Sequence, residues 1–402
     1  MTSPLSPKAR ALEPSATLAM AARAKQLAAE GKDVVSFTVG EPDFKTPAHI
    51  CAAAKKAVDD GLHGYTPSNG LPALLKAVAD HFRKTTGVVY EPSRIVVSPG
   101  AKFSIYLALQ VLTSAGDEVL IPAPYWVSYP EMARLAGATP VALPTREDRD
   151  FALTADALEA AITPRTKLLI LNTPSNPTGG VIPAGEIEKI ARVLQKHNVW
   201  CLADEIYDQL AYGAEKPLSI ASISDWNRDH SVVINGASKT YAMTGWRVGW
   251  AAGPAEVVKA MGDWQSQSTS NACAIAQAAA IAALTGPQEC VAEMRAEFAA
   301  RADVMARLLN DIPGVTCRRP TGAFYALPNI SKLFGRKLGG RLVNNPTDFC
   351  NAALDACHVA MVAGETFGAP DHVRISYACS RERIEEGCRR LRDLVGRGAT
   401  RE

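Results

Sequence analysis

The chain has 402 residues, of which 47% are hydrophobic, and its formal net charge is +2. This length and composition are enough to bury a large core, and they predict one large domain together with a smaller one. The nearly balanced charge, without a basic block, argues against nucleic acid as a partner, and the longest apolar stretch, residues 272–284, is too short to span a membrane.

Two further features of the sequence concern the cellular compartment of the protein. The first twenty residues contain charged residues and prolines but no continuous apolar run, which predicts that no signal peptide is present. The nine cysteines are scattered and form no CxxC pair, as expected for reduced thiols. We therefore expect a cytoplasmic protein without a membrane partner, a metal site or a disulfide framework.

The first quarter of the chain is predicted to be mainly helical. A polar arm covers residues 1–15, and Gly31 ends the first helix because glycine suits the position after a helix. Thr46 is expected to cap a later helix, with Pro47 at its first position. The expected elements are a helix over 17–30, a strand over 34–39, a helix over 46–60 and a helix over 72–85.

From residue 94 onward, apolar strands alternate with helices. This rhythm predicts a mainly parallel sheet covered by helices on both faces. The strands are expected over 94–97, 118–121, 167–171 and 199–204, with a helix over 183–196 before the last of them. Since ligands bind at the carboxyl ends of such strands, the residues that follow each strand are the first candidates for a site.

The segment from Ser98 to Lys102 follows the first of these strands and leads into a helix. Small residues at such a junction let backbone N–H groups converge on an anion, so Gly100 and Ala101 are candidate phosphate contacts or simply a helix cap. Lys102 is a candidate for a second phosphate contact or simply an exposed lysine in the first turn of the helix. Neither a GxGxxG nor a GxxxxGK[ST] pattern occurs, which argues against a nicotinamide or P-loop enzyme.

Three residues after the next strands have a physical reason to contact a ligand. Trp126 offers a flat face for a cationic ring, although a buried core tryptophan has the same appearance in sequence. Asn176 lies in an Asn-Pro-Thr-Gly turn and has an amide that can donate a hydrogen bond. Asp204 ends an apolar strand, where an unpaired carboxylate is costly, so we expect either a cationic ligand or a structural ion pair beside it.

The segment 231–250 places Lys239 between two apolar strands. A strand over 231–234 precedes a loop of small residues, and a second strand is expected to begin at Arg247. A single lysine is most often solvated, but these apolar flanks suit a lysine in a pocket. Burial lowers the pKa of a lysine and so supplies the neutral amine that condenses with a carbonyl group.

The last third of the chain contains one more cationic residue that is a candidate for the site. A strand over 372–377 is predicted to expose Arg374, whose guanidinium suits a carboxylate and equally suits a cross-strand ion pair. The polar run 265–270 precedes an Ala-rich helix and is expected at a solvated helix start or at a partner's pocket. A long helix over 287–310 is predicted to connect the two domains, and a strand follows over 321–326.

The pattern Ser-Lys-x-x-x-Met-Thr-Gly-Trp-Arg-x-Gly-Trp, from Ser238 to Trp250, resembles the cofactor-lysine segment of the class I aminotransferases. These enzymes depend on pyridoxal 5′-phosphate (PLP). The resemblance implies that Lys239 binds the cofactor covalently and acts as the catalytic base, while Ser238 and Arg247 bind the cofactor phosphate. It extends from about residue 15 to residue 396, with the matched residues in the order of the family.

The same resemblance implies cofactor contacts elsewhere in the chain. Asp204 would pair with the ring nitrogen, and Tyr207 would donate to the ring oxygen. Tyr65 would reach the phosphate of a neighbouring subunit, which implies a homodimer with shared active sites, although an ordinary loop tyrosine would look the same. The remaining implied contacts are Gly100 and Ala101 to the phosphate, Trp126 stacked on the ring and Asn176 to the ring oxygen.

The substrates implied by the resemblance are amino acids and 2-oxo acids. Arg374 would hold the substrate α-carboxylate, near Gly40, which is otherwise a plain turn glycine; Trp126 and Asn176 also border the substrate. Lys102 matches the lysine that binds the distal carboxylate of acidic substrates in the bacterial aspartate aminotransferase subgroup. That subgroup usually has glutamine at the next position, where this chain has Phe103.

The implied fold is α/β, namely PLP transferase fold type I. A large domain over 47–294 would hold a mainly parallel seven-stranded sheet between helices, and a smaller α+β domain would combine residues 16–46 and 295–402. The implied activity is the transfer of the amino group of L-aspartate to 2-oxoglutarate by a ping-pong mechanism. Alternatives are an aminotransferase for aromatic amino acids or prephenate, a PLP-dependent lyase of the same fold, and a PLP-binding regulator without enzymatic activity.

Overall fold

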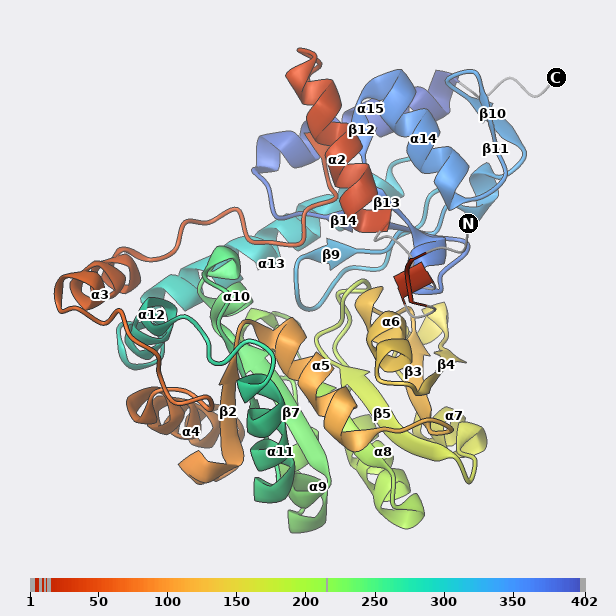
Figure 1. Cartoon of the computed structure of the whole chain (residues 1–402). Helices are drawn as coiled ribbons and strands as arrows, with labels where there is room; N and C mark the ends of the chain where they lie inside the picture. Colours follow the sequence, from red (N-terminus) through yellow and green to blue (C-terminus); the bar gives the residue numbers. More distant parts are fainter. Residues whose placement is uncertain (1–3, 7–8, 11, 13–15, 215, 398–402) are drawn as a thin grey trace.

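The computed structural model describes residues 4–6, 9–10, 12, 16–214 and 216–397. The arm predicted for residues 1–15 therefore lies mostly outside the described residues. Figure 1 shows a wide body built on a twisted sheet, with a narrower body above it formed by the two ends of the chain.

A seven-stranded sheet forms the centre of the wide body. Its strand order is β2-β8-β7-β6-β5-β3-β4, and β8 runs antiparallel to both of its neighbours while all other pairs are parallel. The expected mainly parallel α/β sheet is thus confirmed. The strands are β2 Ile95–Ser98, β3 Glu118–Ala123, β4 Thr139–Pro144, β5 Thr166–Asn172, β6 Trp200–Asp204, β7 Ser231–Gly236 and β8 Gly249–Ala252.

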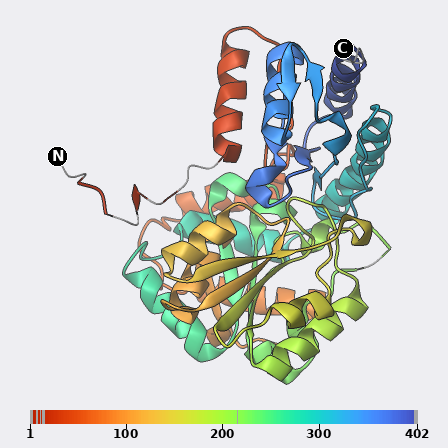
Figure 2. The same ribbon diagram turned by 90° about the vertical axis from the view of Figure 1, so that its right-hand side faces the viewer.

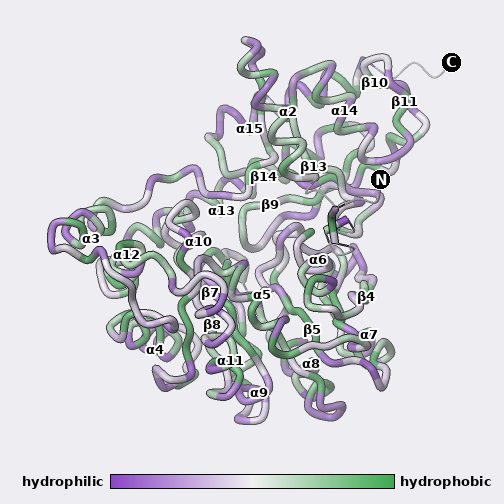
Figure 3. Tube along the Cα trace, viewed as in Figure 1, coloured by the Kyte–Doolittle hydropathy of each residue, from purple (hydrophilic) through white to green (hydrophobic). Residues whose placement is uncertain are grey.

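Both faces of this sheet are apolar, because successive side chains of a strand point to opposite faces. On β5, Leu168 and Ile170 belong to one hydrophobic cluster, whereas Leu169 and Leu171 belong to another. Burial of each such side chain stabilises the fold by about 1.5–3 kcal/mol. Figure 3 shows these hydrophobic stretches along β5 and the helix beside it, with hydrophilic residues at the outer loops.

Helices cover the two faces of the sheet. The first face is covered by α5 Ala101–Leu112, α6 Ser128–Leu135 and α11 Ala255–Ser266. The second face is covered by α3 Ala48–Asp59, α4 Pro72–Thr86, α7 Ala155–Ala161, α8 Ala184–His197, α9 Asp225–Asp229 and α12 Ala274–Thr285. Short helical segments at the upper edge of the sheet are η3 Asp208–Leu210, α10 Ala237–Thr240 and η5 Thr244–Trp246.

The narrower body combines segments from both ends of the chain (Figure 2). Strand β1 near the start pairs in parallel with β12 near the end, and β9 and β13 flank β14 in an antiparallel sheet. Its helices are α2 Ala16–Ala29, α14 Pro346–Cys357 and α15 Arg381–Arg397. Its strands are β1 Val35–Ser36, β9 Tyr325–Ala326, β10 Arg336–Leu338, β11 Arg341–Val343, β12 Val359–Ala360, β13 Val362–Ala363 and β14 Val373–Ser376.

Helix α13, Glu289–Asn310, runs between the two bodies, as predicted. Val291 in its first turn packs into the core of the wide body, whereas Phe298 and Leu309 pack into the core of the narrow body. The domain boundaries at residues 46–47 and 294–295 stay a prediction.

Three local expectations were wrong. Thr46 does not cap α3, because its hydroxyl donates to the carbonyl oxygen of Ala242 at 2.7 Å, and Pro47 holds the N-cap position. Only Val35–Ser36 of the expected strand over 34–39 pairs as a strand. Arg247 does not begin β8, since its φ of 54° places it in a left-handed turn, and the strand begins at Gly249.

The described residues lack both a helix that could cross a membrane and a cluster that could hold a metal ion. None of their helices combines the length and the apolar character needed to cross a membrane. None of their clusters of histidine, cysteine, aspartate and glutamate is arranged to hold a metal ion.

Candidate active site

A pocket of about 510 Å³ lies between the carboxyl edge of the large sheet and the narrow body. Its volume is in the range of small-molecule sites. It brings together most of the predicted site residues, from segments as far apart as Gly40 and Arg374. The predicted residues that line it are Gly40, Ala101, Lys102, Trp126, Asn176, Asp204, Tyr207, Ser238, Lys239, Arg247 and Arg374.

Lys239 lies in the short helix α10, which directly follows strand β7. Its ammonium group donates to the carbonyl oxygen of Gly40 and lies 5.9 Å from the centre of the Tyr207 ring and 5.7 Å from that of Phe324. Burial, which removes water from the charged form, lowers the pKa of Lys239 to about 8. A substantial fraction of the amine is therefore neutral near physiological pH, as a nucleophile requires.

Asp204 ends β6 and is buried beneath the pocket. Its carboxylate accepts hydrogen bonds from the Tyr129 hydroxyl at 2.6 Å and from the Ile206 amide at 3.2 Å. Burial raises the pKa of Asp204 to about 6, although these bonds oppose the rise. Within the described part of the chain Asp204 forms no ion pair, which disfavours the structural ion-pair interpretation and leaves room for a cationic ligand.

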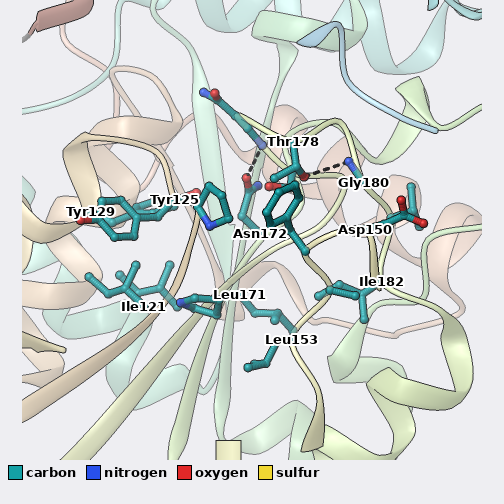
Figure 4. A pocket seen from close by; sticks show the side chains of 18 residues that line it. Ile121, Tyr125, Tyr129, Asp150, Leu153, Leu171, Asn172, Thr178, Gly180 and Ile182 are labelled. Atoms are coloured by element: carbon teal, nitrogen blue, oxygen red, sulfur yellow. Dashed lines mark hydrogen bonds between the residues drawn. The ribbon is translucent and has the colours of Figure 1, made fainter. Parts of the chain in front are cut away.

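Asn172, the last residue of β5, was not predicted as a site residue but holds the turn that contains Asn176. Figure 4 labels Asn172 with Thr178 and Gly180 of this turn, in a small pocket that adjoins the site. The Asn172 side-chain oxygen accepts from the Asn176 amide at 2.9 Å, and its nitrogen donates to the Asp204 carbonyl oxygen at 2.9 Å. The Gly180 amide donates to the Thr178 hydroxyl at 3.0 Å on the other side of the same turn. The turn therefore presents Asn176 from a fixed backbone beside Asp204.

At the opposite end of the pocket, Arg247 lies against the start of α5. Gly100 is the N-cap residue of that helix and has a φ of +92°. A Cβ atom on Gly100 would lie 2.5 Å from a terminal guanidinium nitrogen of Arg247, so only glycine allows this approach. The helix start, Arg247 and Ser238 together suit an anion such as a phosphate.

Arg374 lies in β14, the middle strand of the small sheet, and its side chain is 2% exposed. The expectation that it is exposed on the strand was wrong, because the pocket-facing side of β14 is covered. Its guanidinium donates to the Asn176 side-chain oxygen at 3.2 Å and to the Thr38 carbonyl oxygen at 3.0 Å, while its Nε atom has no protein partner. Within the described ranges Arg374 forms no cross-strand ion pair, so donors remain for a carboxylate ligand.

Lys102 and Trp126 form the outer wall of the pocket. The Lys102 ammonium nitrogen lies 4.7 Å from the centre of the Trp126 ring. Burial, together with the nearby charge of Arg247, lowers the pKa of Lys102. Lys102 therefore borders the pocket but stays exposed to solvent, so the structure leaves the alternative of an exposed first-turn lysine open.

Two predicted features lie outside this arrangement. Tyr65 is 93% exposed and does not line the pocket of its own chain, so its predicted role requires a second chain. Gln265 is fully buried at the end of α11 and donates to the Val97 carbonyl oxygen at 2.8 Å, so it is not part of a solvated helix start.

Tyr129 and Tyr325 also line the pocket and were not predicted as site residues. Tyr129 is three residues after Trp126. A buried carboxylate such as that of Asp204 needs hydrogen-bond donors, and this need could have indicated Tyr129 from the sequence. Tyr325 lies in β9 of the narrow body, and only the packing of the two bodies brings it to this pocket.

These residues fit PLP in its charges and in their order along the pocket. The anion-binding end formed by α5 and Arg247 suits the phosphate, and buried Asp204 suits a protonated ring nitrogen. Lys239 lies between these two ends, beside Tyr207, and Asn176 lines the same pocket. The pocket thus offers a suitable side chain to the phosphate, to the ring nitrogen and to the carbonyl carbon of the cofactor.

Comparison with known proteins places residues 32–391 in a family described as aminotransferase class I and II. An aspartate aminotransferase of Geobacillus stearothermophilus is 48% identical over 387 residues, which cover 96% of this chain and 98% of the relative. An aspartate/prephenate aminotransferase of Cereibacter sphaeroides is 46% identical over 94% of this chain and 96% of its own. The crystal structure of the aspartate aminotransferase from Rhizobium meliloti superposes with a TM-score of 0.94 at 39% identity, covering 98% of this chain and 99% of that one.

Proposed function

The chain belongs to the class I and II aminotransferases and is a PLP-dependent transaminase, and we propose that it transfers the amino group of L-aspartate to 2-oxoglutarate. Curated relatives that are 42–48% identical to the chain include several aspartate aminotransferases. The observation that supports an acidic substrate is the presence of two cations, Arg374 and Lys102, in the pocket that contains Lys239. A dicarboxylic amino acid has one carboxylate for each of them.

In the proposed mechanism each residue acts on a named part of the substrate. Arg374 binds the α-carboxylate through its free donors, and Lys102 binds the distal carboxylate, so that the Cα–H bond faces Lys239. Bound PLP supplies an electron sink for the electron pair of the broken C–H bond. The Lys239 amine would take up the α-proton at Nζ and later release it on the cofactor side of the substrate nitrogen, which leaves the amine neutral again.

Asp204 and Tyr207 would tune this chemistry. The Asp204 carboxylate, held by Tyr129, favours a protonated ring nitrogen because a buried anion stabilises a nearby cation. Tyr207 and Asn176 would donate to the ring oxygen, and Ser238, Gly100, Ala101 and Arg247 would bind the phosphate. The release of one oxo acid before the second binds gives ping-pong kinetics.

Prephenate, or its amino product, is a second candidate substrate. Prephenate also has two carboxylates, and some relatives of this chain are named aspartate/prephenate aminotransferase. Lys102 and Arg374 would serve either substrate, whereas an aromatic amino acid offers no second carboxylate to Lys102.

The proposal includes a homodimer, a cytoplasmic location and the division into a large domain over 47–294 and a small one. The 93% exposure of Tyr65 supports the dimer, because a partner chain would bury that ring at its own pocket. Mixing a Lys239→Ala chain with a Tyr65→Ala chain should restore part of the activity, since one of the two hybrid sites has all its residues intact. If the mixture is no more active than the sum of its parts, the shared site is refuted.

The first test is a visible absorption spectrum of the purified protein with PLP, followed by stepwise addition of aspartate and then phenylalanine. We expect a visible cofactor band that aspartate bleaches with release of oxaloacetate. A band that responds only to another amino acid would refute the role of Lys102. Absence of any band after PLP is added would refute the cofactor site.

A further inference from the structure

Tyr325 lies at the junction between the groups proposed for the cofactor and those proposed for the substrate. It belongs to β9, is 1% exposed and lines the pocket. Neither the sequence motifs nor the proposed mechanism uses it. Its ring and its hydroxyl group contact two different residues of the site.

The ring of Tyr325 supports Arg374. The guanidinium carbon of Arg374 lies 4.7 Å from the centre of the Tyr325 ring and 4.9 Å from that of Phe367. An aromatic face attracts a cation but does not occupy its N–H donors as a carboxylate would. The two rings therefore fix the guanidinium while leaving donors for the substrate carboxylate.

The hydroxyl group of Tyr325 lies 3.1 Å from the hydroxyl group of Tyr207. Both side chains are buried, and Tyr207 has only one proton to donate. If Tyr325 is the donor of this pair, the Tyr207 proton is free to point into the pocket, where Lys239 lies. Gly40 passes close to the same hydroxyl, since a Cβ atom on Gly40 would lie 3.3 Å from it.

We infer that Tyr325 is a positioning residue that orients the Tyr207 hydroxyl toward the cofactor and the Arg374 guanidinium toward the substrate carboxylate. The inference rests on the proposed function and deepens it. One side chain of the narrow body thereby links both halves of the site, through its hydroxyl on one side and its ring face on the other.

The two contacts can be separated by two substitutions in the holoenzyme. Tyr325→Phe keeps the ring and removes the hydroxyl, so Tyr207 loses its donor and donates less strongly to the ring oxygen. The ring oxygen then keeps more negative charge to stabilise a proton on the Lys239 nitrogen. We expect the pH midpoint of the visible cofactor band to rise by roughly half a unit, with the dissociation constant of succinate within about twofold of the parent.

Tyr325→Leu removes both contacts. The pH midpoint should rise as in Tyr325→Phe, and the dissociation constant of succinate should also rise by about tenfold, because Arg374 loses one of its two supporting rings. Succinate is used because it has both carboxylates and no amino group to react. If the leucine variant does not fold, the phenylalanine variant alone decides the hydroxyl contact, and Phe367→Leu measures the loss of a ring face on Arg374.

Tyr212→Phe is the matched control. Tyr212 has a nearly buried hydroxyl that bonds to the Tyr377 hydroxyl and to the carbonyl oxygens of Gly322 and Ala323, and it contacts neither Tyr207 nor Arg374. It should leave the pH midpoint and the succinate affinity unchanged. An unchanged midpoint in Tyr325→Phe, or an equal rise in Tyr212→Phe, would overturn the inference. The proposed function fails separately, if the parent protein shows no band or no response to aspartate.

Discussion

The two ends of the pocket are built in different ways. The cofactor end comes from three neighbouring parallel strands of one sheet, since Asp204 ends β6 while Asn176 and Lys239 follow β5 and β7. The substrate end combines Gly40 from the start of the chain with Arg374 from near its end, and both belong to segments of the narrow body or its border. The first end depends on one rigid sheet, whereas the second depends on how two bodies pack.

This difference has a consequence for mutations. Changes at the cofactor end should affect the chemical step for every substrate, because all substrates react at the same atoms. Changes at the substrate end should affect binding and discrimination between substrates. The following predictions test that separation, from the largest expected effect to the smallest.

Lys239→Ala should reduce kcat by at least about 10⁴-fold with every amino donor, since it removes both the covalent anchor and the base. The measurement is single-turnover conversion of aspartate by the PLP-loaded variant. Lys259→Ala is the control, because Lys259 is an exposed lysine paired with Asp263 on α11. Turnover within tenfold of the parent would contradict the assignment of Lys239.

Arg374→Lys should lower kcat/KM for aspartate by about 10²–10³-fold, mainly through KM. An ammonium group cannot reproduce the two parallel hydrogen bonds of a guanidinium, and its shorter reach leaves the Asn176 oxygen unpaired. Steady-state kinetics with aspartate and with phenylalanine should show similar losses, because both have an α-carboxylate. Arg341→Lys, on the exposed β10–β11 hairpin, is the control.

Lys102→Met should lower kcat/KM for aspartate by about tenfold while leaving that for phenylalanine unchanged or higher. Methionine keeps much of the side-chain volume against Trp126 but removes the charge. The ratio of the two specificity constants is the quantity to measure. An equal loss for both substrates would assign Lys102 to the cofactor end of the pocket, and Lys76→Met provides an exposed control.

Glu205→Gln changes a buried carboxyl group next to Asp204, and of the predictions made here its effect on the protein should be the smallest. Burial raises the pKa of Glu205 to about 8, so the folded state keeps a proton that the unfolded state releases above about pH 4.5. Stability of the parent should therefore fall as pH rises from 4.5 to 8. The variant cannot ionise, and at pH 8.5 its Tm should exceed that of the parent by about 2–5 °C.

The gain in Tm of Glu205→Gln should shrink toward pH 5, because this pH is close to the unfolded-state pKa of about 4.5, so that proton release stabilises the unfolded parent much less than at pH 8.5. Calorimetric scans at the two pH values give the comparison. An equal difference at both pH values would show that the proton on Glu205 is not its cause, and kcat should change little in either case because Glu205 does not line the pocket.

Much of the fold followed from the sequence alone, because strand and helix periodicities are local. The apolar strands over 167–171 and 199–204 are found within one residue at each end, and the helix over 72–85 ends one residue later than predicted. The prediction of helix caps from the sequence was less reliable. Thr46 met the sequence rule for an N-cap, but the tertiary bond from its hydroxyl to Ala242 took that side chain away from the helix.

The sequence by itself determined the residue types of the cofactor end, since a parallel sheet places the residues after its strands at one edge. Only the tertiary structure decided the surroundings of Arg374, the hydrogen bond from Tyr129 to Asp204 and the place of Tyr325 in the pocket. These contacts join residues separated by about 50 to more than 300 positions in the chain. Sequence periodicity describes neighbours along one element, whereas contacts of this kind arise when separate elements pack and remove each other's side chains from water.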